Sequence, residues 1–259
     1  MKRIGIVPVS QGAGAGFIMA MVSTELAAMR GYGGGKKETQ VDEGGIIALE
    51  LGPGDLYDRL CVDRWFRIRQ MVSYWNCVHG EGLVERIVNP KCGVNWFLRT
   101  PMDLPVQGIN ESGIGGREMQ LERGRAVKLL YSLPGDLAFV DFSSVEEENL
   151  WYLLGDMDQV VAVIDPLPSK LLEGYERICR LKLWKEPVTW VINRWTDQID
   201  GKELKKILGL EKNQVIIPEV PRGLLYQGEY TGIGMIEHQQ TRRLTASGME
   251  ELIKRLNVL

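Results

Sequence analysis

The sequence predicts a three-layer α/β/α protein whose sheet is mainly parallel and contains about seven strands. Short runs of β-branched residues alternate with helical stretches along the chain, which is typical of a parallel sheet covered by helices on both faces. A glycine-rich turn from Ser10 to Gly16 follows the first apolar run, as expected where a parallel strand passes into a helix. The composition, with 44% hydrophobic and 25% charged residues, suits a single globular domain over residues 1–259.

Each expected strand is a short apolar run bounded by glycine, proline or polar residues. The runs are Arg3 to Val9, Ile46 to Leu51, Val127 to Ser132, Ala138 to Asp141, Gln159 to Ile164, Thr189 to Asn193 and Gln214 to Ile217. Helices are expected where apolar residues recur every three or four positions. They lie near Phe17 to Met29, Val145 to Leu154, Ser169 to Lys182, Gly201 to Leu208 and Ala246 to Asn257.

Two segments depart from this alternation. The polar stretch from Arg30 to Gly45 is longer than most connections between a helix and a strand. Residues 57–124 combine tryptophans with glycines, prolines and charges. We expect them to form an irregular Trp-rich insertion in the single domain, with a helical part followed by a loop from Gly108 to Gly124.

The composition excludes several classes of protein. The net charge of −3 gives no support for binding nucleic acid through overall charge. No apolar stretch approaches the roughly 20 residues of a membrane span, and the first residues lack the pattern of a signal peptide, so we expect a cytoplasmic protein. The four cysteines form no C-x-x-C pair and are expected to be reduced. A metal site built from Cys61, Cys77, Cys92 and His79 is the alternative.

The turn from Ser10 to Gly16 has the outline of a phosphate-binding loop. A strand, a glycine-rich turn and a helix N-terminus direct backbone N–H groups to one point, which attracts an anion. The active form of the motif, G-x-x-x-x-G-K-[ST], adds a lysine for the phosphates and a hydroxyl for Mg²⁺. This chain has Ala15 and Gly16 in their place. The backbone therefore retains the shape of a phosphate site, while the side chains of a nucleotide-hydrolysing enzyme are missing.

Four landmarks, spread over residues 3–232, follow the order of the ParA/MinD family of deviant P-loop ATPases. After the glycine-rich turn, Ala48 to Gly54 resembles the strand-ending D-x-D-P-Q segment of that family. Leu137 to Ser144 is similar to the apolar run and Asp-Thr-Pro-Pro of its second switch. Val191 to Arg194 resembles the V-x-N-R strand end whose asparagine reads adenine, and Ile216 to Glu219 resembles the I-P-E segment beside the base. The resemblance implies a P-loop NTPase-like fold.

The resemblance also implies which residues contact a nucleotide. They are Gln11, Gly12, Ala13, Gly14, Ala15, Gly16, Phe17, Asn193, Arg194, Pro218 and Glu219. ATP or ADP is the implied cofactor, with Mg²⁺ directed by Asp141; an active site would use Glu50 and Asp141, and a fully decayed one would bind neither nucleotide nor metal. Alternatively, the glycines only allow a tight strand-to-helix turn, and Asp141 and Asn193 only hold turns.

The departures from the family pattern determine the expected activity. Ser10 and Ala15 stand where the family has two lysines, and Gly16 stands at the hydroxyl that binds Mg²⁺. Gly52 replaces the aspartate that positions the attacking water. Phosphoryl transfer depends on positioning and charge neutralisation, and loss of one such group commonly lowers the rate by ~10²–10³-fold. A degenerate Walker A motif of this kind predicts a protein that is non-catalytic or very weakly active.

The favoured function is therefore a scaffold, responsive to nucleotide or free of it, that localises or assembles other proteins and forms a homodimer. The most specific analogy is with TadZ-like relatives, which have altered loops and place pilus-assembly machinery at a cell pole. One alternative is a slow ATPase whose cation comes from Lys36, Lys37, Arg3 or Arg117. A weaker alternative is a DNA-partitioning factor with a local basic patch.

The C-terminal segment is expected to be an amphipathic helix. Met249, Leu252, Ile253 and Leu256 fall on one face, as they would on a helix packed against the sheet. Some relatives end in a membrane-targeting helix, so peripheral contact with a membrane or cell pole is the alternative.

Overall fold

The computed structural model describes residues 1–32, 45–52, 56–62, 90–100, 123–209 and 214–259. Its strands are β1 (Lys2–Pro8), β2 (Ile46–Glu50), β3 (Pro90–Lys91), β4 (Val94–Phe97), β5 (Leu137–Asp141), β6 (Gln159–Ile164), β7 (Val188–Trp195) and β8 (Gln214–Pro218). They form one sheet in the order β3-β4-β2-β5-β1-β6-β7-β8. All neighbouring strands are parallel except β3 and β4. The predicted parallel sheet is confirmed, with the two-residue β3 as an antiparallel addition at its edge.

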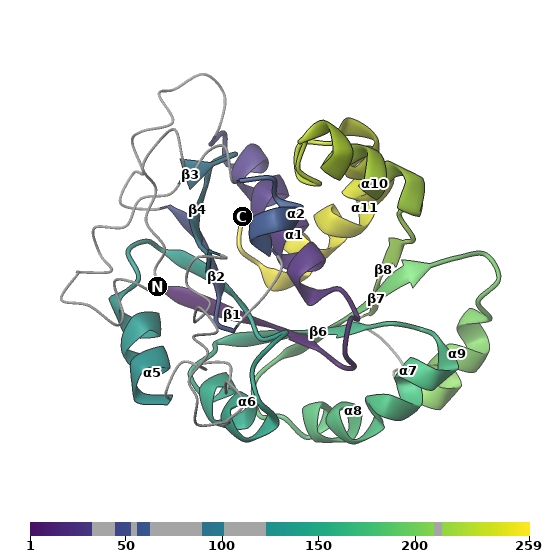
Figure 1. Cartoon of the computed structure of the whole chain (residues 1–259). Helices are drawn as coiled ribbons and strands as arrows, with labels where there is room; N and C mark the ends of the chain where they lie inside the picture. Colours follow the sequence, from purple (N-terminus) through teal and green to yellow (C-terminus); the bar gives the residue numbers. More distant parts are fainter. Residues whose placement is uncertain (33–44, 53–55, 63–89, 101–122, 210–213) are drawn as a thin grey trace, which may run out of the picture.

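Helices cover both faces of this sheet, as Figure 1 shows. One face carries α1 (Ala15–Met29), α2 (Leu56–Arg59), α10 (Arg222–Thr231) and α11 (Gln239–Leu256). The other carries α5 (Arg123–Ser132), α6 (Glu147–Leu154), α7 (Pro168–Glu173), α8 (Tyr175–Lys182) and α9 (Gly201–Leu208). Because strand residues alternate between faces, Ile46 and Ala48 join the core under α1, whereas Ile47 and Leu49 join the core on the other side.

The helix α1 is buried on nearly all sides. Eleven of its fifteen residues are buried, which is the pattern of a helix enclosed by other elements. It packs on β1, β2 and β5 beside α11, which packs on β7 and β8, and Arg242 of α11 forms an ion pair with Glu25 of α1 at 2.9 Å. The N-terminus of α1 is consequently held in place directly beside the end of β1.

The C-terminal helix packs against the body of the protein, as its apolar stripe predicts. Met249, Leu252, Ile253 and Leu256 are all buried in the core shared with α1. Gly248 permits a close approach to β8, because a Cβ there would lie 2.6 Å from the carbonyl oxygen of Ile216. The stripe is therefore part of the core.

Three expected elements differ from the structure. The C-terminal helix, expected from Ala246, begins at Gln239. Val127 to Ser132 was expected to be a strand, but it belongs to the helix α5. Its buried residues Ala126, Leu129 and Leu130 have the i, i+3, i+4 spacing of a helix face, and that spacing outweighs the β-propensity of a short apolar run. The expected helix from Ser169 to Lys182 is divided into α7 and α8 at Gly174.

The described part of residues 57–124 contains regular structure. The strand β4 pairs in parallel with β2, and β3 forms a hairpin with β4. The side chain of Trp96 is almost completely buried, and its indole N–H donates to the carbonyl oxygen of Lys91 at 3.0 Å. This part of the segment extends the main sheet; the expected loop from Gly108 falls almost entirely outside the described residues.

Candidate functional site

Most of the predicted site residues lie at the carboxyl edge of the parallel sheet. The loop Ser10–Gly16 follows β1, Glu50 ends β2 and Asp141 ends β5. Asn193 and Arg194 stand near the end of β7, and Pro218 ends β8. Ligands in open α/β sheets bind at this edge, where neighbouring connections lead to opposite faces. Here β1 lies between β5 and β6, with α1 on one face of the sheet and α7 on the other.

The loop itself has the backbone of a tight, glycine-dependent turn. Gly12 and Gly14 have φ angles of 75° and 93°, in the left-handed region that favours glycine. Gly14 is also the N-cap of α1, and within the described residues no side chain caps that helix end. The N-terminal end of α1, which carries the positive end of the helix dipole, is therefore adjacent to the loop.

Asn193 holds the loop from the side. Its amide nitrogen donates to the carbonyl oxygen of Ala13 at 2.9 Å, and the asparagine is buried. A Cβ on Gly14 would lie 2.4 Å from the same nitrogen, so only glycine fits there. Asn193, which is expected to read a base, therefore uses one N–H of its amide to bind the loop. Its second N–H and its amide oxygen remain as a donor and an acceptor.

A carboxylate contacts the outer end of the loop. The N–H of Gln11 donates to Glu173 at 2.7 Å, and the other carboxylate oxygen of Glu173 pairs with Lys170 at 2.7 Å. Gly174, the next residue, packs against Val9 so closely that a Cβ would lie 2.6 Å from the Val9 carbonyl oxygen. The junction between α7 and α8 is thus in direct contact with the start of the loop.

The charge of Glu173 gives a pH-dependent prediction. The hydrogen bond from Lys170, and then the one from Gln11, lowers the pKa of the Glu173 carboxyl below its ordinary value. A pKa depressed by folding stabilises the protein above the unfolded value of about 4.3, and this stability is lost as the pH falls through the folded value. Glu173→Gln is therefore expected to lower the free energy of unfolding by more at pH 7 than at pH 3.

Urea denaturation at the two pH values measures this difference. The matched control is Glu176→Gln, because the one ion pair of Glu176 among the described residues is with the exposed Arg180, across one turn of α8. An equal effect of Glu173→Gln at pH 7 and pH 3 would contradict the assigned role of its charge.

Two buried carboxylates lie side by side near the start of α1. Glu50 and Asp141 are direct neighbours across β2 and β5, and both are about 3% exposed. Glu50 accepts the Leu56 N–H at 3.3 Å, while Asp141 accepts the N–H and hydroxyl of Ser143 at 2.8 and 2.6 Å. The second oxygen of Asp141 would lie 3.0 Å from a Cβ at Gly16. A carboxylate so placed fits Mg²⁺, which prefers carboxylate, phosphate and water oxygens.

Gly52 occupies the position where the resemblance implies a water-positioning aspartate. A Cβ on this residue would lie 2.6 Å from the Cβ of Ser144 and 2.8 Å from its carbonyl oxygen. Side-chain atoms do not fit at such distances without movement of the Ser144 backbone. The close packing of Gly52 against Ser144, where β2 and β5 end, therefore leaves no room for an aspartate side chain.

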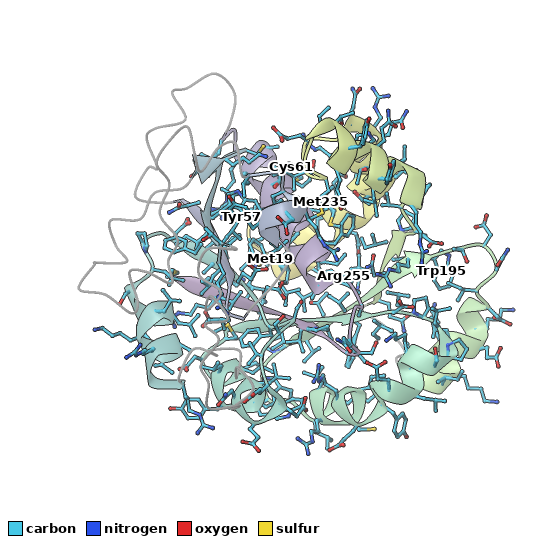
Figure 2. All side chains as sticks on the ribbon, viewed as in Figure 1. Met19, Tyr57, Cys61, Trp195, Met235 and Arg255 are labelled. Atoms are coloured by element: carbon cyan, nitrogen blue, oxygen red, sulfur yellow. The ribbon has the colours of Figure 1, made fainter. Side chains whose placement is uncertain are left out.

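A cavity of about 250 Å³ lies beside the loop, between the start of α1, the end of β7 and the helices α10 and α11. Five predicted residues line it: Gly14, Phe17, Asn193, Arg194 and Glu219. Figure 2 shows Met235, another lining residue, on the same side of the sheet as Met19, with Trp195 toward the β8 edge. The other predicted site residues, among them Glu50, Asp141 and Pro218, do not line the cavity. The cavity of about 250 Å³ and the pair of carboxylates, Glu50 and Asp141, are therefore two distinct parts of the candidate site.

Sequence reasoning missed the part of the cavity formed by α10 and its neighbours. The residues involved are Arg59, Leu167, Val220, Arg222, Leu224, Leu225, Gly228, Glu229, Met235, His238 and Thr241. Pro221 directly before Arg222 is the N-cap of α10 and was an available signal for a helix start. For Met235 and His238 no local motif gives a signal, because tertiary packing alone brings them to the cavity.

Arg194 is paired within the site. It has a φ angle of 58°, unusual for a residue other than glycine, and its guanidinium donates to the buried Asp165 at 2.6 Å. The pair joins the end of β7 to the turn after β6. The positive charge of Arg194 is thus paired with the Asp165 carboxylate of the protein itself.

The alternative cation Arg3 is far from the loop. It lies near the amino end of β1, and its guanidinium stacks over the Tyr131 ring at 4.1 Å. Five residue steps along the strand separate it from Pro8, which corresponds to about 16 Å. Lys36, Lys37 and Arg117 lie outside the described residues, as does Cys77 of the alternative metal set. In the described ranges no group of three or more His, Cys, Asp or Glu residues is placed to hold a metal ion.

None of the helices in the described ranges is long and apolar enough to cross a membrane. The parallel sheet, the glycine-rich loop leading into α1 and the polar strand ends together define a P-loop NTPase-like fold. This is the fold that the sequence predicts.

Comparison with solved structures identifies the type of P-loop protein that this fold resembles. The cell division ATPase MinD of Pyrococcus furiosus has a TM-score of 0.66 at 17% identity, with 98% of this chain and 99% of that chain covered. MinD of Pyrococcus horikoshii in complex with Mg-ADP has a TM-score of 0.66 at 15% identity, with 99% and 98% covered. The ParA family ATPase of Chlorobium tepidum has a TM-score of 0.64 at 16% identity, with 97% of each chain covered.

The chain therefore has the fold of the ParA/MinD ATPases over nearly its whole length. The sequence itself matches no protein-family model and no curated protein.

Proposed function

We propose that this chain is a ParA/MinD-like protein with a nucleotide-responsive but catalytically weak site, and that it acts as a scaffold. The observation that carries the proposal is the packing at Gly52. A Cβ there would lie 2.6 Å from the Ser144 side chain, so the position cannot carry a residue that orients an attacking water. Without such a residue, a bound nucleotide is hydrolysed very slowly.

The missing cations support the same proposal. Ser10 and Ala15 occupy the two positions at which the resembled family has lysines, and Ala15 is buried with only 1% of its surface exposed. Neutralising charge on a transferring phosphoryl group is the largest contribution that such sites make, and one missing donor commonly costs ~10²–10³-fold in rate. Several missing groups together predict very slow turnover.

The cavity beside Asn193 supports nucleotide binding without turnover. Its walls combine Phe17 and Leu225 with the amide of Asn193, as ligand sites combine apolar walls with a few polar groups. Solved relatives in this fold include a MinD in complex with Mg-ADP. In this chain Asp141 would hold Mg²⁺, which would supply the charge neutralisation that the loop lacks.

The biological role that we propose is localisation or assembly of other proteins, with homodimerisation as the working form. The specific role that we propose is assembly of pilus or secretion machinery at a cell pole. TadZ-like proteins, whose loops are similarly altered, provide the analogy for this system.

The proposal predicts binding without hydrolysis. Phosphate release from ATP and Mg²⁺ is expected to be at least about 10²-fold slower than that of an intact MinD assayed beside it. Ligand at 100 times its Kd is expected to stabilise the fold by about 2.7 kcal/mol, which differential scanning fluorimetry detects as a rise of several degrees in Tm.

The matched control is Asp141→Asn, which removes one charge and keeps the shape of the side chain. Phosphate release that equals the intact MinD and falls in Asp141→Asn would show a working ATPase and overturn the proposal. Absence of both stabilisation and binding heat with nucleotide would remove its nucleotide-responsive part.

A further inference from the structure

The cavity beside Asn193 and the loop after β1 differ in what they offer a ligand. The cavity volume of about 250 Å³ is slightly below the roughly 300–1,000 Å³ of typical small-molecule sites. Its apolar walls include Phe17, Val220 and Met235, which are nearly buried. A flat, uncharged ring system with an attached sugar suits a cavity of this size and character.

The hydrogen-bonding state of Asn193 selects the ring chemistry. The amide nitrogen donates one of its two hydrogens to the carbonyl oxygen of Ala13, so the amide oxygen and the second N–H remain for a ligand. An oxygen acceptor at a buried position pairs with an N–H donor, such as the exocyclic amino group of a purine. The cavity therefore has an element of direct recognition that does not depend on phosphate.

The loop offers little to a chain of phosphates. The side chains at its two former lysine positions are Ser10 and Ala15, both buried and uncharged. Its outermost donor, the N–H of Gln11, is already bound to the carboxylate of Glu173. Each added phosphate brings negative charge toward this carboxylate, and like charges repel each other.

We propose that this site binds an aminopurine nucleoside or its monophosphate in preference to the di- and triphosphate. The inference rests on the proposed function, because it specifies the ligand class of the same site. The base and sugar occupy the cavity and supply most of the binding free energy. Additional phosphates meet the Glu173 end of the loop and weaken binding.

Isothermal titration of the full chain with adenosine, AMP, ADP and ATP, each with and without Mg²⁺, tests the proposal. We expect adenosine and AMP to bind at least about tenfold more tightly than ATP, which corresponds to about 1.4 kcal/mol. Tightest binding of ATP would overturn the ligand preference while leaving the proposed nucleotide response intact. Absence of binding by all four ligands would overturn both.

Two pairs of variants identify the groups responsible. Leu225→Trp places a large side chain in the cavity and is expected to weaken AMP at least tenfold, whereas Tyr226→Trp, on the exposed side of α10, should change nothing. Glu173→Gln removes the charge at the loop and keeps an oxygen acceptor for Gln11; it should raise ATP affinity several-fold. Glu176→Gln on α8 makes the same charge change away from the loop and should leave ATP affinity unaltered.

Unaltered ATP affinity in Glu173→Gln would contradict the assigned role of its carboxylate. Unaltered AMP affinity in Leu225→Trp, with the fold retained by circular dichroism, would show that the cavity is not the binding site.

Discussion

Replacement of Trp96 by alanine is expected to lower the free energy of unfolding by about 3–5 kcal/mol. The side chain is 1% exposed and lies in the core beneath α1. Truncation would leave a large cavity and remove the indole hydrogen bond to Lys91. The ammonium group of Lys91 donates to the carbonyl oxygen of Leu60 and forms an ion pair with Glu237. The hairpin is therefore bonded both to the residue after α2 and to the turn before α11.

Chemical denaturation followed by fluorescence and circular dichroism measures this loss. Trp96→Phe is the matched control, because it keeps an aromatic ring and removes the indole N–H; it should cost only about 1–2 kcal/mol. A loss below about 1 kcal/mol in Trp96→Ala would mean that β3 and β4 are peripheral to the main core, as an appended insertion would be.

Replacement of Gly14 by alanine is expected to lower the free energy of unfolding by about 2–5 kcal/mol. A side chain at its φ angle of 93° costs about 1–2 kcal/mol, and a Cβ 2.4 Å from the amide of Asn193 adds about 1–3 kcal/mol of overpacking. Displacement of Asn193 would also break its bond to Ala13. The variant is therefore expected to lose ligand affinity together with stability.

Gly12→Ala separates the two contributions. Gly12 has a φ angle of 75°, but in the part of the chain that the structure describes no heavy atom beyond its chain neighbours lies within 4 Å of its Cβ position, so only the conformational cost of about 1–2 kcal/mol applies. Urea denaturation of both variants gives the comparison. Equal losses in Gly12→Ala and Gly14→Ala would show that contact with Asn193 does not restrict position 14.

Much of the sheet was predictable because its central strands are continuous apolar runs. Strands such as β1 and β6, buried on both faces, give a strong signal in any sequence window. The error at Val127 to Ser132 arose because a six-residue apolar run has the length of a strand, while its helical spacing becomes visible only when Ala126 is included.

The hairpin of β3 and β4 was missed for a different reason. Cys92 and Gly93 both have positive φ angles, as two-residue hairpin turns favour. The pair Cys92-Gly93, a small residue followed by glycine between two short extended runs, was an available signal for this hairpin turn. The high density of tryptophan, charge and proline in the surrounding segment obscured it.

The site was predictable where backbone geometry creates it and not where distant packing does. The loop, Asp141 and Asn193 follow from strand ends, which the sequence locates well. The packing of Gly52 against Ser144, the contact of Glu173 with Gln11 and the cavity wall at Met235 depend on residues far apart in the chain. Nothing in the local sequence specifies these pairs.

The bond between Asn193 and Ala13 joins residues 180 positions apart in the chain. Closing so large a loop is costly in chain entropy, and contacts of this range form slowly. During synthesis the turn after β1 leaves the ribosome long before Asn193 does. A nascent N-terminal portion therefore lacks the hydrogen bond from Asn193 to the carbonyl oxygen of Ala13. The proposed ligand site can form only after β7 (Val188–Trp195) pairs with β6, so we expect ligand binding to require the chain at least through β7.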